Sequence, residues 1–173
     1  MDLRYPIGKW EVGGELSPEC RNQMIEEIAL TPEKVRMAVS GLSAEQLDTP
    51  YRPEGWTVRQ VIHHLADSHL NAYVRFRLAL TEQEPLIKPY QEGLWAALPD
   101  ACSAPVEPSL ALLEGLHDRW VRLLRSMRSA DFARTFRHPE RGVMTLDATL
   151  RIYEWHGRHH TAHITALRQR MGW

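Results

Sequence analysis

The chain has 173 residues, 21 Lys and Arg against 22 Asp and Glu, and 43% hydrophobic residues. This length and composition are those of one soluble globular domain, which we expect to span residues 1–173. A net charge of −1 provides no basic excess for the phosphate backbone, so we expect no nucleic-acid partner. The first residues lack a signal-peptide pattern, and no apolar run approaches the roughly 20 residues that cross a bilayer. The expected location is therefore the cytoplasm, with no membrane contact.

The first predicted elements are an irregular arm and a helix that contains a proline. Glycines and a proline make residues 1 to about 16 an irregular, partly extended arm. Ser17-Pro18 has the pattern of an N-cap followed by proline at the first helical position, which opens a helix. Thr31-Pro32 repeats that pattern, so the segment to about Leu42 is either two abutting helices or one helix with a proline kink.

A long helix and a long loop occupy the middle of the chain. Thr57 and Gln60 have the spacing of a capping box, and apolar residues after them follow one face of a helix to about Thr81. Residues 84–108 contain five prolines and form the longest predicted loop. Loops of this length are often functional.

Two more helices complete the predicted fold. A third apolar face extends from Leu110 to about Met127, and residues 132–142 read as a polar connection. Thr145 then opens a last helix that reaches the C-terminus. No segment shows convincing strand alternation flanked by hairpin turns. The predicted class is all-α, a four-helix bundle of the kind that builds metal sites between facing helices.

Histidine is the unusual residue of this composition. Cys20 and Cys102 lie far apart and outside any CxxC pattern, so they predict neither a disulfide framework nor a cysteine zinc site. There are nine histidines. Seven fall in two short clusters, one on the middle helix and one on the last: His63, His64, His69, His156, His159, His160 and His163.

Helical spacing ranks the histidines of the last helix. His156 and His160 are four residues apart, so their rings lie on one face and could share a metal ion. A projection at roughly 100° per residue places His160 beside the apolar stripe, with His156 next to it. The same projection turns His159 toward solvent. His156 and His160 are therefore the predicted ligand pair on this helix.

Spacing alone does not choose the third ligand on the middle helix. His63 points away from the apolar stripe, whereas His64 and His69 flank it on opposite sides. Three imidazoles with a fourth position open to water or substrate form a site of the catalytic zinc type, in which the pKa of bound water falls to roughly 7. The same donors suit nickel, iron or manganese. The alternative is that these histidines bind no metal and are either exposed to solvent or hydrogen-bonded within the core.

Both histidine clusters resemble the signature stretches of the DinB/YfiT-like superfamily. The stretches are residues 55–69 (GWTVRQVIHHLADSH) and 153–164 (YEWHGRHHTAHI), and the likeness includes residues 3–9 (LRYPIGK) and covers nearly the whole chain. Either stretch alone would be weak evidence for the family, whereas the two together are specific to it. The resemblance implies an up-down-down-up four-helix bundle, here with an irregular N-terminal arm, that assembles as a homodimer.

The resemblance also implies a particular ligand set. The first ligand of the family is the histidine directly before the Leu-x-Asp-Ser run, here His64, and the other two are His156 and His160 of an H-x-x-x-H sequence. Asp67, one turn after His64, is the candidate catalytic carboxylate, because it could accept the second N–H of a ligand histidine or act as a base. A surface carboxylate is an equally simple reading of Asp67.

The activity that the resemblance implies is that of a metal-dependent hydrolase acting on a small molecule. Zinc is the first expectation for the divalent ion. Related thiol S-transferases of the bacillithiol type make transfer of a low-molecular-weight thiol to an electrophile the alternative. A non-catalytic, stress-associated metal-binding bundle is a second alternative.

Overall fold

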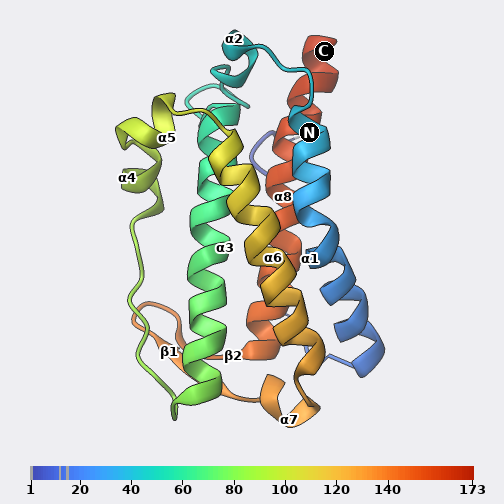
Figure 1. Ribbon diagram of the computed structural model, residues 1–173, viewed down its shortest axis with the longest axis vertical. Helices are drawn as coiled ribbons and strands as arrows, with labels where there is room; N and C mark the ends of the chain where they lie inside the picture. Colours follow the sequence, from blue (N-terminus) through green and yellow to red (C-terminus); the bar gives the residue numbers. More distant parts are fainter. Residues whose placement is uncertain (1, 12, 15) are drawn as a thin grey trace.

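The structure is a computed structural model that describes residues 2–11, 13–14 and 16–173. In Figure 1 the first and last long helices run upward, and the two between them run downward. This up-down-down-up arrangement confirms the predicted all-α four-helix bundle. The bundle consists of α1 (Pro18–Val39), α3 (Val58–Thr81), α6 (Glu107–Ser126) and α8 (Leu146–Met171).

Helix α1 is continuous through its internal proline, so the second of the two predicted alternatives, one helix, is the correct one. The Ser17 hydroxyl caps it by accepting a hydrogen bond from the Cys20 N–H at 3.2 Å. Pro32 lies inside the helix and has no N–H with which to bond the carbonyl of Ile28, four residues earlier. The Ile28 carbonyl is therefore available to a partner from outside the helix.

Helices α3 and α8 begin where their capping residues predict. The Thr57 hydroxyl accepts from the Gln60 N–H, and the Gln60 side chain accepts from the Thr57 N–H. The Thr145 hydroxyl caps α8 by accepting from the Ala148 N–H at 3.1 Å. Such caps satisfy backbone N–H groups that have no partner within the helix. They fix the register of the two helices that bear the histidine clusters.

The parallel direction of α3 and α6 requires a long crossover, and the proline-rich segment supplies it. The prediction of a simple loop over residues 84–108 is only partly correct, because two short helices form within it (Figure 1). Proline at the first turn and short polar stretches allow single helical turns that sequence periodicity cannot reveal. The short helices of the chain are α2 (Ala44–Leu47), α4 (Glu92–Ala96), α5 (Pro99–Ser103) and α7 (Ser129–Phe132).

The expected absence of strands is wrong in one place. Strands β1 (Thr135–His138) and β2 (Gly142–Thr145) form an antiparallel hairpin that begins in the predicted polar connection and extends to the N-cap of the last helix. The register pairs Phe136 with Met144 and His138 with Gly142. Gly142 has φ +74°, a left-handed conformation that suits glycine at the end of the turn. Each strand has only four residues, too few for alternation to be recognised in the sequence.

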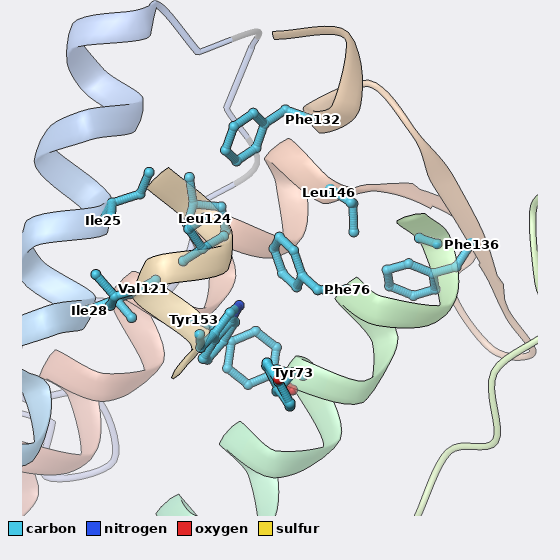
Figure 2. Close-up of a cluster of buried hydrophobic side chains, with 14 of the residues drawn as sticks. Ile25, Ile28, Tyr73, Phe76, Val121, Leu124, Phe132, Phe136, Leu146 and Tyr153 are labelled. Atoms are coloured by element: carbon cyan, nitrogen blue, oxygen red, sulfur yellow. The ribbon is translucent and has the colours of Figure 1, made fainter. Parts of the chain in front are cut away.

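The apolar core consists of two clusters separated by a polar layer. Figure 2 shows part of the first cluster, which includes Phe76 of α3. Ala72 is the first residue of α3 in this cluster. In the second cluster, Ala66 is the last residue contributed by α3 and Ile164 is the first contributed by α8. The first cluster ends at Tyr153 on α8. The two histidine stretches fill the level between the clusters, so most of their rings are enclosed by the bundle.

The N-terminal arm has no helix or strand in its described part, as the prediction of an irregular segment requires. Residues 1, 12 and 15 of the predicted arm lie outside the described residues. The carbonyl of Arg4 accepts a hydrogen bond from His163, and the Tyr5 ring lies 5.9 Å from that of His159. The arm is therefore packed against α8. Among the described helices, none is both long and apolar enough to cross a membrane.

Candidate metal centre

Three histidines converge at the level between the two apolar clusters. His64, on α3, and His156 and His160, on α8, each offer a ring nitrogen, and these nitrogens lie within 4.8 Å of one another. The Nε2 atoms of His64 and His156 are 3.2 Å apart. Two nitrogens bound to one tetrahedral zinc ion at roughly 2.0–2.1 Å lie roughly 3.3 Å apart. The donor set therefore fits a divalent ion.

A chain of hydrogen bonds fixes the tautomer of His156. The Ile28 carbonyl, which Pro32 leaves without a helical partner, can only accept, so Nδ1 of His117 donates to it at 2.7 Å. Neutral His117 then accepts at Nε2 from Nδ1 of His69, at 2.8 Å. Nε2 of His69 accepts in turn from Nδ1 of His156, at 3.1 Å. The lone pair of His156 is consequently on Nε2, the atom that faces His64.

A second, shorter chain does the same for His160. The carbonyl of Arg4 accepts from Nε2 of His163 at 3.1 Å, so Nδ1 of neutral His163 carries the lone pair. That atom accepts from Nδ1 of His160 at 3.3 Å. Nε2 of His160 is left unprotonated. Both ligand candidates of α8 are thus oriented by imidazole chains that end at a backbone carbonyl, through His69 and His117 for His156 and through His163 for His160. Metal-binding histidines commonly donate their second N–H to a fixed acceptor.

Burial keeps these imidazoles neutral, which is the form that binds metal. Burial, assisted by the proximity of His163, lowers the pKa of His64 to about 4. Burial lowers the pKa values of His156 and His160 well below the usual value of 6.5, and the neighbouring histidines lower them further. Protons therefore do not compete for these nitrogens near pH 7.

A cavity of about 640 Å³ opens beside the three histidines. It lies along α3 and α8 and is bordered by residues 89–94 of the crossover and by the β-hairpin. His64, His156 and His160 all line it. A site whose ligands adjoin a cavity of this size leaves room for a substrate next to the ion, unlike a closed structural site.

The other predicted histidines and Asp67 are arranged differently. Asp67 is half-buried on α3 and does not appear among the described residues that line the cavity. Burial raises its pKa, and the negative charge of Asp100 raises it further. His63 is bonded to Ser109 at 2.7 Å. The structure thus brings neither Asp67 nor His63 to the three-histidine cluster.

The expectation that His159 points to solvent is wrong. Its side chain is buried, because its ring stacks on Trp155 at 4.2 Å and Tyr5 of the arm lies beside it. The helical projection considered the bundle alone and ignored the arm that covers this face. His163, also on α8, is buried as well, stacked on Tyr51 at 3.9 Å.

Sequence reasoning missed four residues of the site. His117 on α6 stands alone in sequence, and only a helical projection of α6 against α3 would have suggested it. Tyr90 and His138 belong to segments predicted as loops, so no periodicity indicated that they face a cavity. Ser68 follows Asp67 directly, and its place in the cavity wall follows from its position on the face of α3 that carries His64.

The hydrogen-bond chain through His69 provides a direct test. Replacing His69 with phenylalanine leaves Nδ1–H of His156 without an acceptor, and we expect metal affinity to fall about ten- to a hundredfold. Glutamine can both donate to His117 and accept from His156, so His69→Gln should bind metal within a few-fold of the original protein. Competition with a chromogenic chelator measures both affinities. Equal losses in the two variants would contradict the role of the chain.

A four-helix bundle with three convergent imidazoles beside a cavity defines a class of histidine-ligated metal-binding bundles. Comparison with known families identifies the family of the chain. Residues 27–164 match the DinB superfamily, and the chain belongs to it.

Named relatives resemble the chain over almost its whole length. Proteins of Bacillus mycoides strain KBAB4 and Bacillus cereus strain 03BB102 are each 54% identical over 172 residues, covering 99% of both chains, and each is named "Putative metal-dependent hydrolase". A solved structure, that of YfiT from Bacillus subtilis, matches with a TM-score of 0.97 and 48% identity, covering 100% of this chain and 99% of its own. It is described as a probable metal-dependent hydrolase with an unusual four-helix bundle topology.

Proposed function

We propose that this protein is a metal-dependent enzyme that hydrolyses a small molecule. The observation that carries the proposal is the convergence of three buried, neutral imidazole rings on the wall of a cavity large enough for a substrate. The names of the Bacillus relatives support the same reaction class. The cavity argues against a non-catalytic bundle, because an ion that only braces helices has no need of one.

The proposed ligands are His64, His156 and His160, and the proposed ion is divalent, with zinc first and nickel, iron or manganese as alternatives. When bound, such an ion supplies Lewis acidity, which polarises a carbonyl and lowers the pKa of a coordinated water or thiol. The chain itself orients the ligands through His69 and His163. Burial among the helices restricts the access of bulk water to this end of the cavity.

Transfer of a low-molecular-weight thiol is the alternative reaction at the same site. Cys20 and Cys102 are the only thiols of the chain and both are exposed. Neither lines the cavity among the described residues, so a thiol nucleophile would have to come from a co-substrate. The cavity has room for such a molecule beside the three histidines.

One experiment separates the two reactions. Metal-loaded protein is assayed for conjugation of monochlorobimane with a panel of low-molecular-weight thiols and for hydrolysis of an ester and amide panel. Hydrolysis that is lost in His160→Ala and kept in His63→Gln supports the proposal, because His63 lies outside the cluster. Thiol-dependent conjugation with the same dependence on His160 would establish the transferase instead. Neither activity with stoichiometric metal would contradict both.

Asp67 provides a prediction about proton transfer. It does not line the cavity among the described residues, so we expect Asp67→Asn to retain metal and to change turnover by less than about threefold, since a general base must reach the proton that it removes. Steady-state kinetics on the best substrate of the panel measures the change. Loss of turnover with full metal content would instead give Asp67 the role of base that the sequence suggests.

We also propose that the protein is a homodimer, as the resemblance implies. Large apolar side chains are exposed on α3 and on the crossover segment and would be covered in an assembly. Light scattering after gel filtration is expected to give twice the mass of the chain, and a monomeric mass would contradict the proposal. The exposed side chains concerned are Leu70, Val74, Leu86, Leu94 and Leu98.

A further inference from the structure

The cavity beside the three histidines extends away from them toward the hairpin. Along α3 its wall includes His64, Ser68 and Arg75. Arg75 is eleven residues after His64, which is three helical turns, or about 16 Å, along the same face of the helix. At that end the hairpin contributes His138 and Arg141. The cavity is therefore elongated, with the candidate metal centre at one end and basic side chains at the other.

The two arginines of this remote end are unusual in having no partner among the residues that the structure describes. Within the described chain, the other arginines each have a hydrogen bond, an ion pair or an aromatic ring against the side chain. Arg75 and Arg141 have none of these, and both line the same cavity. Arg75 is half-buried as a residue, and its guanidinium group has no acceptor among the described residues. An arginine in this position has its planar set of N–H donors free for a ligand.

His138 adds a third donor at the same end. Its Nδ1 accepts the backbone N–H of Glu140 at 3.2 Å, so the neutral ring carries its proton on Nε2. Glu92 and Glu140 also line this end, but both are exposed. Apart from burial, the positive charges of Arg75 and Arg141 are the strongest influences lowering the pKa of His138, and the two carboxylates oppose them less strongly. At the His138 ring the two arginines therefore act more strongly than the two carboxylates.

We propose that Arg75, Arg141 and His138 bind an oxyanion, the carboxylate or phosphate of an elongated substrate whose other end lies at the three histidines. Planar guanidinium groups match both of these anions in geometry and charge. The apolar part of the cavity wall, which includes Phe136, Met144 and Ile152, suits an aliphatic or aromatic connecting portion. The inference rests on the proposed function only in placing the reacting group at the metal centre.

The test measures binding to metal-loaded protein by titration calorimetry. The probes are the linear dicarboxylates glutarate, adipate, suberate and sebacate, with octanoate as a single-ended control and 8-phosphonooctanoate as the phosphate counterpart. We expect one dicarboxylate length to bind at least about tenfold more tightly than octanoate, which is the typical effect of one charge-assisted hydrogen-bonded pair. That margin should disappear in Arg75→Gln. It should persist in Arg77→Gln, on the same helix, whose side chain is exposed and bonded to Tyr73.

The relative affinity of suberate and 8-phosphonooctanoate identifies which anion the remote end prefers. Equal binding of octanoate and every dicarboxylate would overturn the inference. So would an unchanged margin in Arg75→Gln, or the absence of measurable binding by any probe. Because the titration needs no turnover, the dicarboxylate preference can hold even when the ester and thiol assays are negative. Failure of the proposed function and failure of the anion site are therefore distinguishable.

Discussion

His160→Ala is expected to remove stoichiometric divalent metal from the protein, and His156→Ala is expected to do the same. Each substitution leaves two of three converging imidazoles and opens a void on the wall of the cavity. Removing a ligand should lower metal affinity by more than the roughly ten- to hundredfold loss caused by altering a group that hydrogen-bonds to a ligand. Mass spectrometry of the metal content of dialysed, tag-free protein measures the result, with about one ion per chain expected before substitution.

His159→Ala is the matched control, because it alters the same helix and also removes a buried imidazole. The His159 ring stacks on Trp155 and lies against the arm, so its loss should lower stability but keep the metal. A comparison of thermal unfolding with and without added metal separates the two effects, since an ion that binds the native state raises its stability. Loss of metal in His159→Ala together with its retention in His156→Ala would contradict the assigned ligands.

Local signals made most of the bundle predictable from the sequence. The N-caps Ser17, Thr57 and Thr145 and the apolar periodicity after each of them specify where α1, α3 and α8 begin. The hairpin was missed because its pairing of Phe136 with Met144 is a contact between segments, and each strand is too short to show a period. Short elements that are stabilised by tertiary packing carry little signal of their own.

The site was predictable in part, for a similar reason. The H-x-x-x-H spacing on α8 places His156 and His160 on one face, whereas only the resemblance selected His64 over His69. The hydrogen bonds favour the same choice, because Nε2 of His69 already accepts a hydrogen bond from His156. His69 is also not among the described residues that line the cavity. The role of His117 depends on the carbonyl that Pro32 frees on another helix. No property of a single segment contains that information.

Acid is expected to unfold the metal-free protein between about pH 6.5 and 4. Burial lowers the pKa of His64 and of His117 to about 4, so the unfolded chain binds more protons than the native one throughout this range. The stability that these groups contribute is complete above pH 6.5 and is lost as the pH falls toward 4. Each group accounts for roughly 3 kcal/mol over that interval. Two such losses are comparable with the roughly 5–15 kcal/mol stability of a typical domain.

Urea unfolding followed by circular dichroism at a series of pH values measures this loss. His117→Gln is the informative variant, because its amide can donate to the Ile28 carbonyl and accept from His69 without titrating. In this variant the unfolding free energy should fall less steeply as the pH drops, with a slope that corresponds to about one bound proton fewer. Its metal affinity near pH 7 should stay close to that of the original protein. If stability did not decline between pH 6.5 and 4, the buried imidazoles would have to accept protons in the folded state. That would contradict the neutral tautomers on which both hydrogen-bond chains depend.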